Sequence, residues 1–555
     1  MILAKHKSQT FVFGAIILLF SNIMVKVIGA VFKIPLTNTI GVKGMAYFNA
    51  AYSIYVTFYM LSTAGIPVAI SRMIAASKTV GNVKEVKKIF KISYWLFFTV
   101  GLAGTIVMMA FSRFFADFSK IPESYLAMIA IAPTLFFICL SSAYRGYFQG
   151  LQNMVPSAVS QVIEAAGKLG IGLFAAWFFY VKKGYSLDVV AAYVIAGVTI
   201  GVFAATVYIY IVKLMYNSSA DYKKMTKDSE NMTVRDTKDL LKELVFTALP
   251  IALASSIMGL TNTVDTLIMA RQLIKTGITE EAATSFYGAY TSIVIPLFNM
   301  TPTFIYPFAI SVIPALSSSI AAGKKEDCVK QMESAFRMAA IIAVPCAIGM
   351  GTMSKYIIAF LYNKEAIETG RGITNSVDLA APGLSVVASA IFFLGIISIT
   401  NSILQAYRYE KQTIISTSAG IIMKIICTYF LTLIPDIGIL GSAIGTAAGY
   451  FTIMSFNVFF VIKYTHYVPG IRRIFLKPLL AGIACGAAAL VFSNFISGYL
   501  SVRITTLVSI AVAGFVYIVV LLLSKGVNRE DILMLPKGEK VCKVMDKFNL
   551  LEKSA

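Results

Sequence analysis

The chain has 555 residues, of which 58% are hydrophobic and 14% are charged, with a net charge of +21 and a mean hydropathy of +0.78. Because soluble proteins carry about 25% charged residues, this composition argues against a soluble enzyme or nucleic-acid-binding protein and predicts a polytopic membrane protein. The two histidines, His6 and His466, lie outside the apolar runs, which excludes a histidine-rich metal centre. The six scattered cysteines form no CxxC pair, so neither a zinc site nor a disulfide framework is indicated.

Runs of about twenty apolar residues predict fourteen transmembrane helices. The first six spans cover residues 10–32, 46–70, 89–112, 124–143, 157–181 and 189–214, and a polar, charge-mixed stretch follows from 217 to 242. The next six cover 244–272, 284–316, 333–353, 376–404, 412–434 and 438–462, and the last two cover 476–498 and 503–524. The first run lacks a small-residue cleavage site, so we expect a retained helix rather than a signal peptide.

The distribution of positive charge predicts the orientation. An even number of spans puts both termini on one side, together with alternate loops and the adjoining helix ends, a set that includes the loops near 71–88, 215–243, 317–332 and 463–477 and the tail 525–555. This set holds roughly 33 Lys and Arg residues and the opposite set roughly 12, so the positive-inside rule places it in the cytoplasm. The lysine-rich segment 71–91 could also hold anionic lipid, although topology alone accounts for its charge.

An internal repeat is visible in the sequence. SRMIAASK at 71–78 parallels SSSIAAGK at 317–324, Phe148-Gln149 parallels Leu404-Gln405, and Lys168 parallels Lys424. A shift of six spans keeps the orientation, so the repeat is parallel, with its pseudo-twofold axis along the membrane normal. The predicted fold is all-α: six-helix lobes at 1–216 and 244–464, a cytoplasmic linker at 217–243, two additional helices within 465–524 and a cytoplasmic tail at 525–555.

Charged residues inside the predicted spans mark the candidate substrate-binding cavity, because such groups avoid lipid and face the protein interior or water. They are Lys26, Glu164, Lys168, Asp265, Arg271 and Lys424. The basic residues outnumber the acidic ones, which favours an anionic headgroup such as a pyrophosphate. A transporter built from two lobes would hold this group between them, near the middle of the membrane.

Each of these assignments has a plainer alternative. Glu164 and Lys168 are four residues apart and share a helix face, so they could pair with each other and merely join two helices. Arg271 could reach to the outer interface with its charged end. A motif at the cytoplasmic mouth comprises Arg145, Gln149 and Gln152. Arg145 could receive a phosphate there or act only as a positive-inside anchor.

Other features bear on motion and energy. Four prolines between 296 and 314 interrupt one span and predict kinks, which suit either moving lobes or a static bend. Gly167-Lys168 is followed by Leu169, so it is not a phosphate-binding P-loop. We therefore expect no enzyme activity and no cofactor, and a transport process driven by ion gradients, membrane potential or substrate supply.

Three stretches resemble a known family. They are RGYFQGLQNMVPSAVSQVIE at 145–164, GIPVAISRMIAASK at 65–78 and ILQAYRYEK at 403–411. They are similar to blocks of the polysaccharide biosynthesis and stage V sporulation protein B family, which includes MurJ-type lipid II flippases of the multidrug/oligosaccharidyl-lipid/polysaccharide (MOP) exporter superfamily. The resemblance covers the whole chain, and its motifs are less specific for the cargo than for the superfamily.

The resemblance implies a flippase in the bacterial plasma membrane that moves an undecaprenyl-pyrophosphate-linked sugar, in MurJ-type members lipid II, from the inner to the outer leaflet. It implies a cationic cavity in which Lys26 and Arg271 fit the pyrophosphate best, and a lipid-tail groove on 476–524. This chain has mainly lysines where well-studied members have arginines, which leaves the cargo open. Expected partners are the lipid-linked glycan and the bilayer, with cell-wall synthesis machinery as a further candidate and a monomer as the expected state.

Other readings remain open. The cargo could be another lipid-linked polysaccharide, and the role could be vegetative or in sporulation. A multidrug or cation exporter of the same superfamily is an alternative, but such an exporter would use unpaired buried carboxylates, and here lysines prevail. A membrane scaffold or an acyl- or glycosyltransferase is a third alternative. It is disfavoured because the predicted outer loops are short and hold few histidines or acidic residues.

Overall fold

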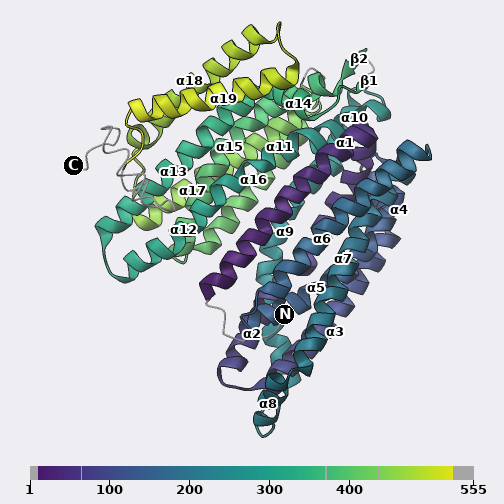
Figure 1. Cartoon of the computed structure of the whole chain (residues 1–555), viewed down its shortest axis with the longest axis vertical. Coiled ribbons are helices and arrows are strands. Elements are labelled where there is room, and N and C mark those ends of the chain that lie inside the picture. The colour runs from purple at the N-terminus through teal and green to yellow at the C-terminus, as the bar shows by residue number, and fades with distance from the viewer. Residues whose placement is uncertain (1–10, 64, 369–371, 436, 529–555) are drawn as a thin grey trace. The chain divides into compact units, whose positions relative to one another are not determined.

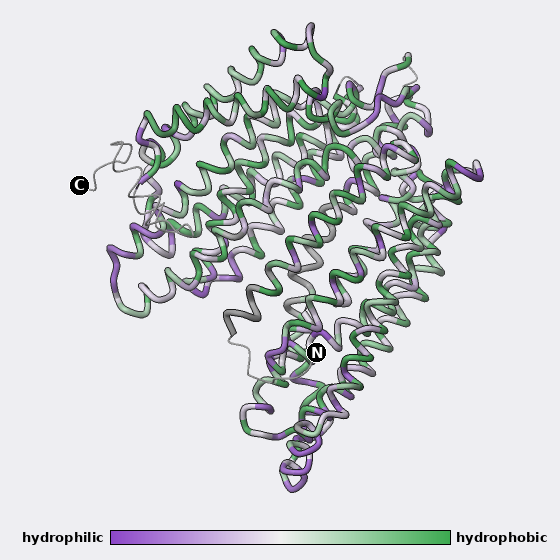
Figure 2. Tube along the Cα trace, in the orientation of Figure 1, coloured by the Kyte–Doolittle hydropathy of each residue, from purple (hydrophilic) through white to green (hydrophobic). Residues whose placement is uncertain are grey.

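The computed structural model describes residues 11–63, 65–368, 372–435 and 437–528, and these are overwhelmingly helical (Figure 1). The first ten residues and most of the predicted cytoplasmic tail, from 529 onward, lie outside the described part. The chain divides into two compact units, residues 1–271 and 272–555. Figure 2 shows apolar residues along the helices and hydrophilic residues gathered at helix ends and connections, as expected for helices that cross a membrane.

The first unit begins with one long broken helix. α1 (Phe11–Thr63) has 53 residues, which at about 1.5 Å per residue is more than twice the roughly 30 Å of a bilayer core. The helical conformation breaks at Gly41, whose φ of 69° is favourable only for a residue without a Cβ. α1 therefore supplies the first two predicted spans, one on each side of Gly41.

The remaining elements of the first unit follow the predicted spans closely. They are α2 (Ile66–Thr79), α3 (Val83–Ala110), α4 (Ser112–Phe118), η1 (Pro122–Ser124), α5 (Tyr125–Gly150), α6 (Val155–Ala175), the π-helical η2 (Ala176–Lys182), α7 (Leu187–Ser218), α8 (Ala220–Asp228) and α9 (Thr237–Lys275). α9 covers the seventh predicted span, and its last residues cross into the second unit.

Glycines let α6 and α7 approach closely. A Cβ on Gly167 would lie 2.5 Å from the Cα of Gly201, and a Cβ on Gly197 would lie 2.8 Å from the backbone nitrogen of Gly172. Small residues at such contacts allow helix backbones to pack directly, which is how membrane helices gain van der Waals contact when lipid is as apolar as their side chains. This packing fixes the face of α6 that carries Glu164 and Lys168.

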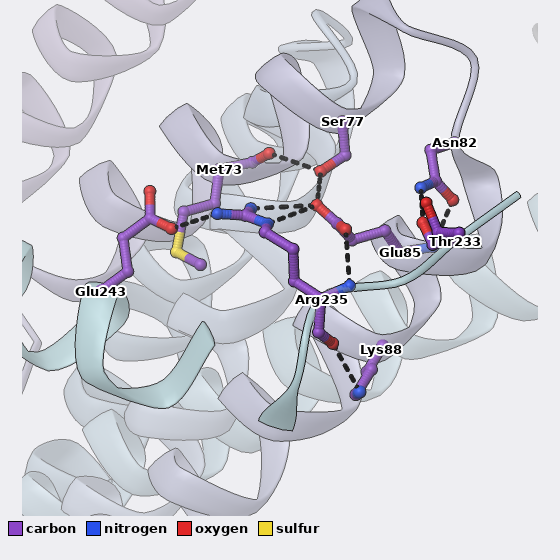
Figure 3. A network of polar contacts seen from close by, with 8 residues as sticks. All are labelled: Met73, Ser77, Asn82, Glu85, Lys88, Thr233, Arg235 and Glu243. Carbon is purple, nitrogen blue, oxygen red and sulfur yellow. Dashed lines mark hydrogen bonds and ion pairs between the residues drawn. The ribbon is translucent and has the colours of Figure 1, made fainter. Parts of the chain in front are cut away.

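The predicted linker 217–243 is ordered rather than a plain loop. It contains α8 and the first turns of α9, and Arg235 joins it to the start of α3 (Figure 3). The guanidinium of Arg235 donates to Glu85 Oε1 from Nη2 at 2.9 Å and from Nε at 3.1 Å, and Glu243 pairs with Nη1 at 2.6 Å. These hydrogen bonds raise the pKa of Arg235 above its usual value. Asn82 also donates to the Thr233 carbonyl at 2.8 Å.

The second unit contains, in its described residues, ten α-helices that lie wholly within it, a π-helical segment and a small hairpin. They are α10 (Glu280–Ala289), η3 (Tyr290–Val294), α11 (Ile295–Met300), α12 (Pro302–Ala321), α13 (Lys325–Thr352), α14 (Ser354–Leu361), β1 (Ala366–Glu368), β2 (Ile373–Asn375), α15 (Ser376–Ala406), α16 (Glu410–Leu431) and α17 (Leu440–Thr465), followed by α18 and α19. The strands pair antiparallel with Ala366 opposite Asn375. The connection near 354–375 therefore holds α14 and this hairpin, neither of which the hydropathy pattern predicts.

The predicted interruption of the proline-rich span is confirmed. Residues 280–321 form α10, η3, α11 and α12 in succession, and α12 begins after Thr301. Proline lacks the backbone N–H of a regular helix, so it sits most easily at the first turn. Pro296 and Pro302 occupy that position in α11 and α12.

The two additional helices, α18 (Ile471–Ile496) and α19 (Val502–Leu523), pack against each other and against α13 and α14. Tyr517 of α19 donates to the Ile341 carbonyl at 2.7 Å, and Thr506 donates to the Tyr356 carbonyl at 3.2 Å. A Cβ on Gly482 would lie 2.6 Å from Val344, so α18 meets α13 at a glycine.

The all-α membrane fold is confirmed. Among the described residues, twelve helical segments are long and apolar enough to cross a membrane, and the first of them, Phe20–Thr79, contains two predicted spans. The exact number of fourteen spans and the parallel repeat stay predictions.

Candidate functional site

The candidate site lies within the first unit, where α5 and α6 meet α1. Arg145, predicted at a cytoplasmic mouth, is inside α5 and 7% exposed. Its Nη2 donates to Glu164 Oε2 of α6 at 2.9 Å, and its Nε donates to Ser160 Oγ at 2.9 Å. Glu164 therefore hydrogen-bonds Arg145, and its interaction with Lys168 four residues away is electrostatic.

Lys168 instead points to aromatic rings of α1. Its Nζ lies 4.4 Å from the ring centroid of Tyr52, 5.1 Å from that of Phe32 and 5.9 Å from that of Phe48. A cation above an aromatic face is stabilised by the ring quadrupole, by about 0.5 to 2 kcal/mol. Within the described part of the chain, this ammonium forms no hydrogen bond or ion pair, so the rings are its direct contacts.

A second lysine, Lys33, completes this group. Its Nζ donates to Asn49 Oδ1 at 3.5 Å, and it lies close enough to Lys168 for the two charges to repel each other. We name Phe32, Lys33, Phe48, Tyr52 and Lys168 the lysine–aromatic cluster. Both halves of α1 and one face of α6 contribute to it, so the break at Gly41 is what brings its two α1 segments together.

The aromatic rings continue along the second half of α1. Successive ring centroids are 5.7 Å apart for Phe48 and Tyr52, 5.8 Å for Tyr52 and Tyr55, and 6.0 Å for Tyr55 and Tyr59. The three tyrosines also lie within electrostatic range of Glu164. Tyrosine combines an apolar ring with a hydroxyl, so this stripe can contact both sugar and lipid surfaces.

The charges of this region do not cancel. Lys33, Lys168 and Arg145 supply three positive charges, and Glu164 supplies one negative charge that already accepts from Arg145. The excess of two lies on the lysine–aromatic cluster. Buried cations without a partner are costly in a membrane protein, so an anion with several oxygens, such as a phosphate or pyrophosphate, would gain charge-assisted hydrogen bonds there.

The other predicted residues of the first unit are spread along it. Lys26 lies two turns before Lys33 on the same side of α1, with an exposed side chain. Asp265 is buried on α9, beside Thr266, whose hydroxyl bonds that of Ser53 on α1 at 2.6 Å. Arg271 stacks on Phe118 at the end of α4, with its Cζ 4.2 Å from the ring centroid.

Three further predicted residues are not members of the cluster. Lys424 is buried in the second unit. A Cβ added to Gly449 would lie 3.2 Å from the Cβ of Lys424, so this lysine packs against a glycine. Gln149 and Gln152 occupy the C-terminal end of α5, where Gln152 is exposed and left-handed with a φ of 59°. Lys78 caps this turn by donating to the Leu151 carbonyl at 2.7 Å. Of the three residues of the mouth motif, Arg145 belongs to the site described above, Gln149 lies in the last turn of α5, and Gln152 follows the helix.

Sequence reasoning missed Lys33, Phe32, Phe48 and Tyr52. The signal that could have found Lys33 is its spacing of seven residues from Lys26, which places both on one helix face. In the described residues, no group of three or more His, Cys, Asp or Glu side chains could hold a metal ion.

The fold and the polar groups inside it define a class: a multi-pass α-helical membrane protein with buried charged residues. The chain belongs to the polysaccharide biosynthesis protein family, whose model matches residues 11–320. It is 23% identical over 531 residues to stage V sporulation protein B of Bacillus subtilis (strain 168), covering 95% of this chain and 98% of that one. It is 23% identical over 525 residues to the lipid II flippase MurJ of the same organism, covering 91% and 94%.

Solved structures support the same fold. The lipid II flippase MurJ in an inward closed conformation matches with a TM-score of 0.63 at 15% identity, covering 92% of this chain and 98% of that chain. An inward-facing multidrug resistance MATE family transporter of the MOP superfamily matches with a TM-score of 0.62 at 14% identity, covering 80% and 94%. The fold that the family resemblance implies is confirmed.

Proposed function

We propose that this chain is a flippase that moves an undecaprenyl-pyrophosphate-linked sugar, with lipid II as the first candidate, from the inner to the outer leaflet of a bacterial plasma membrane by alternating access. The observation that carries the proposal is the lysine–aromatic cluster. It presents two ammonium groups, Lys33 and Lys168, beside aromatic surfaces that suit a sugar, and the carboxylate near them, Glu164, already pairs with Arg145.

In this proposal the residues have separate tasks. Lys33 and Lys168 contact the pyrophosphate by charge-assisted hydrogen bonds. Arg145 and Glu164 neutralise each other and hold α5 against α6, so they position Lys168 rather than bind the cargo. Lys26, two turns along α1 from Lys33, offers the next positive charge on the same side, which would guide the headgroup along the helix.

The predicted residues outside the cluster keep secondary roles. Arg271 and Asp265 lie on α9, which hydrogen-bonds α1 through Ser53 and Thr57, so we propose that they bias the position of α9 during the transport cycle. Lys424 supplies the second lobe with a buried charge. The pair α18 and α19 would hold the lipid tail, and both termini would face the cytoplasm.

A multidrug or cation exporter is the second candidate function. It is favoured because this chain shares its fold with the MATE family transporter. The positive charge of the lysine–aromatic cluster distinguishes a flippase for an anionic cargo from an exporter of cations. A cation would need an available carboxylate, whereas Glu164 already accepts a hydrogen bond from Arg145. An anionic cargo, in contrast, finds two lysines. Flippases for other lipid-linked polysaccharides, including one that serves sporulation, would use the same chemistry.

Complementation tests the function. The chain would be expressed in a bacterium whose only lipid II flippase can be shut off, beside a Lys33→Gln/Lys168→Gln variant. The matched control is Lys182→Gln/Lys183→Gln, which removes two exposed lysines at the end of α6 and η2.

We expect growth with the wild type and the control but not with the cluster variant at equal expression. Growth with all three would remove the cluster from the transport path. Failure of a well-expressed wild type would replace lipid II by another lipid-linked glycan.

A further inference from the structure

A separate pocket lies within the first unit, among α3, α5, α7 and α8. Its volume is about 280 Å³. The residues that line it are Lys87, Phe90, Lys91, Tyr94, Tyr147, Lys213, Asn217 and Tyr222. None of these carries a negative charge, so the pocket combines three lysines with four aromatic rings.

The lysines are held by rings rather than by acids. Lys213 Nζ lies 3.3 Å from the ring centroid of Phe90 and 5.4 Å from that of Tyr147, and Lys87 Nζ lies 5.2 Å from that of Tyr222. Among the described residues, Lys87, Lys91 and Lys213 form no hydrogen bond or ion pair. Cation–π contacts are worth only about 0.5 to 2 kcal/mol, so they leave most of the hydrogen-bonding capacity of three ammonium groups unused.

A buried hydroxyl adds a fourth donor. Tyr147 is 1% exposed, and its hydroxyl lies beside that of Tyr222, with which it interacts at the wall of the pocket. Lys87, Lys91 and Tyr94 occur at intervals of four and three residues and so share one face of α3, while Lys213 and Asn217 share one face of α7. The donors therefore converge from three helices on one space, as the recognition of a compact anion with several oxygens requires.

The surroundings of the pocket indicate where that anion comes from. Trp95 is 55% exposed beside Tyr94 on α3, and Tyr210 and Leu214, which flank Lys213 on α7, are 46% and 47% exposed. In a membrane protein such side chains face lipid, and Trp and Tyr concentrate at the level of the headgroups. Basic pockets between membrane helices are suited to anionic headgroups at this level.

We propose that this pocket binds the phosphate of an anionic membrane phospholipid in the inner leaflet. The lysines and the Tyr147 hydroxyl would contact the phosphate oxygens, and the acyl chains would lie along the exposed apolar residues of α3 and α7. The site lies within one unit and uses no residue of the lysine–aromatic cluster, so it does not depend on the proposed cargo.

Native mass spectrometry of the purified, delipidated full chain tests this. The probes are dioleoylphosphatidylglycerol, dioleoylphosphatidylcholine and inorganic phosphate. We expect phosphatidylglycerol to bind at least tenfold more tightly than phosphatidylcholine. Lys87→Gln/Lys91→Gln/Lys213→Gln should lose at least tenfold in affinity for phosphatidylglycerol. The matched control, Lys223→Gln/Lys224→Gln/Lys227→Gln, removes three exposed lysines of the neighbouring α8 and should bind as the wild type does.

The single variant Lys91→Gln keeps the test available if the triple variant does not fold, because Lys91 is exposed. It should lose about threefold in affinity for phosphatidylglycerol. Equal binding of phosphatidylglycerol by the wild type and the pocket variants would overturn the proposal. Equal binding of the two lipids, with inorganic phosphate displacing neither, would do the same. Tighter binding of inorganic phosphate than of the lipid would overturn the lipid as the source and identify a free phosphate compound.

Discussion

Removing the Arg145 guanidinium should destabilise the first unit measurably. Arg145→Ala deletes the hydrogen bonds to Glu164 and Ser160 and leaves a carboxylate inside the helix bundle. Breaking a fully buried ion pair by removing one partner costs about 3 to 5 kcal/mol. The Glu164 side chain is 30% exposed, so water can reach it, and we expect a smaller loss of about 2 to 3 kcal/mol in the free energy of unfolding.

A double-mutant cycle separates the pair from its surroundings. Glu164→Gln should cost about 1 to 2 kcal/mol, because the amide oxygen still accepts from Arg145 while the charge is lost. In Arg145→Ala/Glu164→Gln no uncompensated charge remains, so the double variant should be more stable than the sum of the single effects by at least about 1 kcal/mol. The assay is titration with sodium dodecyl sulfate in mixed micelles, followed by circular dichroism. Additive effects, or a loss below about 0.5 kcal/mol for Arg145→Ala, would refute the reasoning.

Two further predictions concern the frame around the site. Arg235→Ala removes the hydrogen bonds to the largely buried Glu85 and should cost about 1 to 2 kcal/mol in the same titration. The control Arg113→Ala breaks a pair at 3.9 Å between exposed groups and should change the free energy of unfolding little. Equal losses of stability in the two variants would contradict the expected difference between a buried and an exposed pair. Gly201→Ala puts a Cβ 2.8 Å from a backbone oxygen of α6 and should cost about 1 to 3 kcal/mol, while Gly170→Ala, with open space around it, should be neutral or stabilising. A tolerated Gly201→Ala would show that α6 and α7 can separate freely.

The positions of the membrane helices could be predicted because hydropathy is summed over about twenty residues. The predicted span 376–404 corresponds to α15 at Ser376–Ala406, and 412–434 corresponds to α16 at Glu410–Leu431. Errors of a few residues at either end do not change such a sum. The hairpin of β1 and β2 was missed because three-residue strands leave too short a pattern to detect.

The candidate site was predicted less completely, because side-chain partners depend on tertiary structure. Lys33 was assigned to a loop since the first apolar run ends at Phe32, although α1 continues to Gly41 and beyond. Arg145 was predicted at the cytoplasmic mouth because the fourth apolar run ends at residue 143. In the structure, α5 continues to Gly150 and includes Arg145. Once inside the bundle, its planar guanidinium bonds Ser160 and Glu164 together, a geometry that a lysine four residues away could not match.

The most direct test of the central claim is the binding of undecaprenyl pyrophosphate to the purified full chain, measured against uncharged undecaprenol. We expect tighter binding of the pyrophosphate and a loss of roughly a hundredfold in Lys33→Gln/Lys168→Gln, since two charge-assisted contacts are worth about 3 kcal/mol together. The control Lys182→Gln/Lys183→Gln should bind as the wild type does. Equal affinity of the wild type and the cluster variant for the pyrophosphate would contradict a cationic headgroup site on α1 and α6.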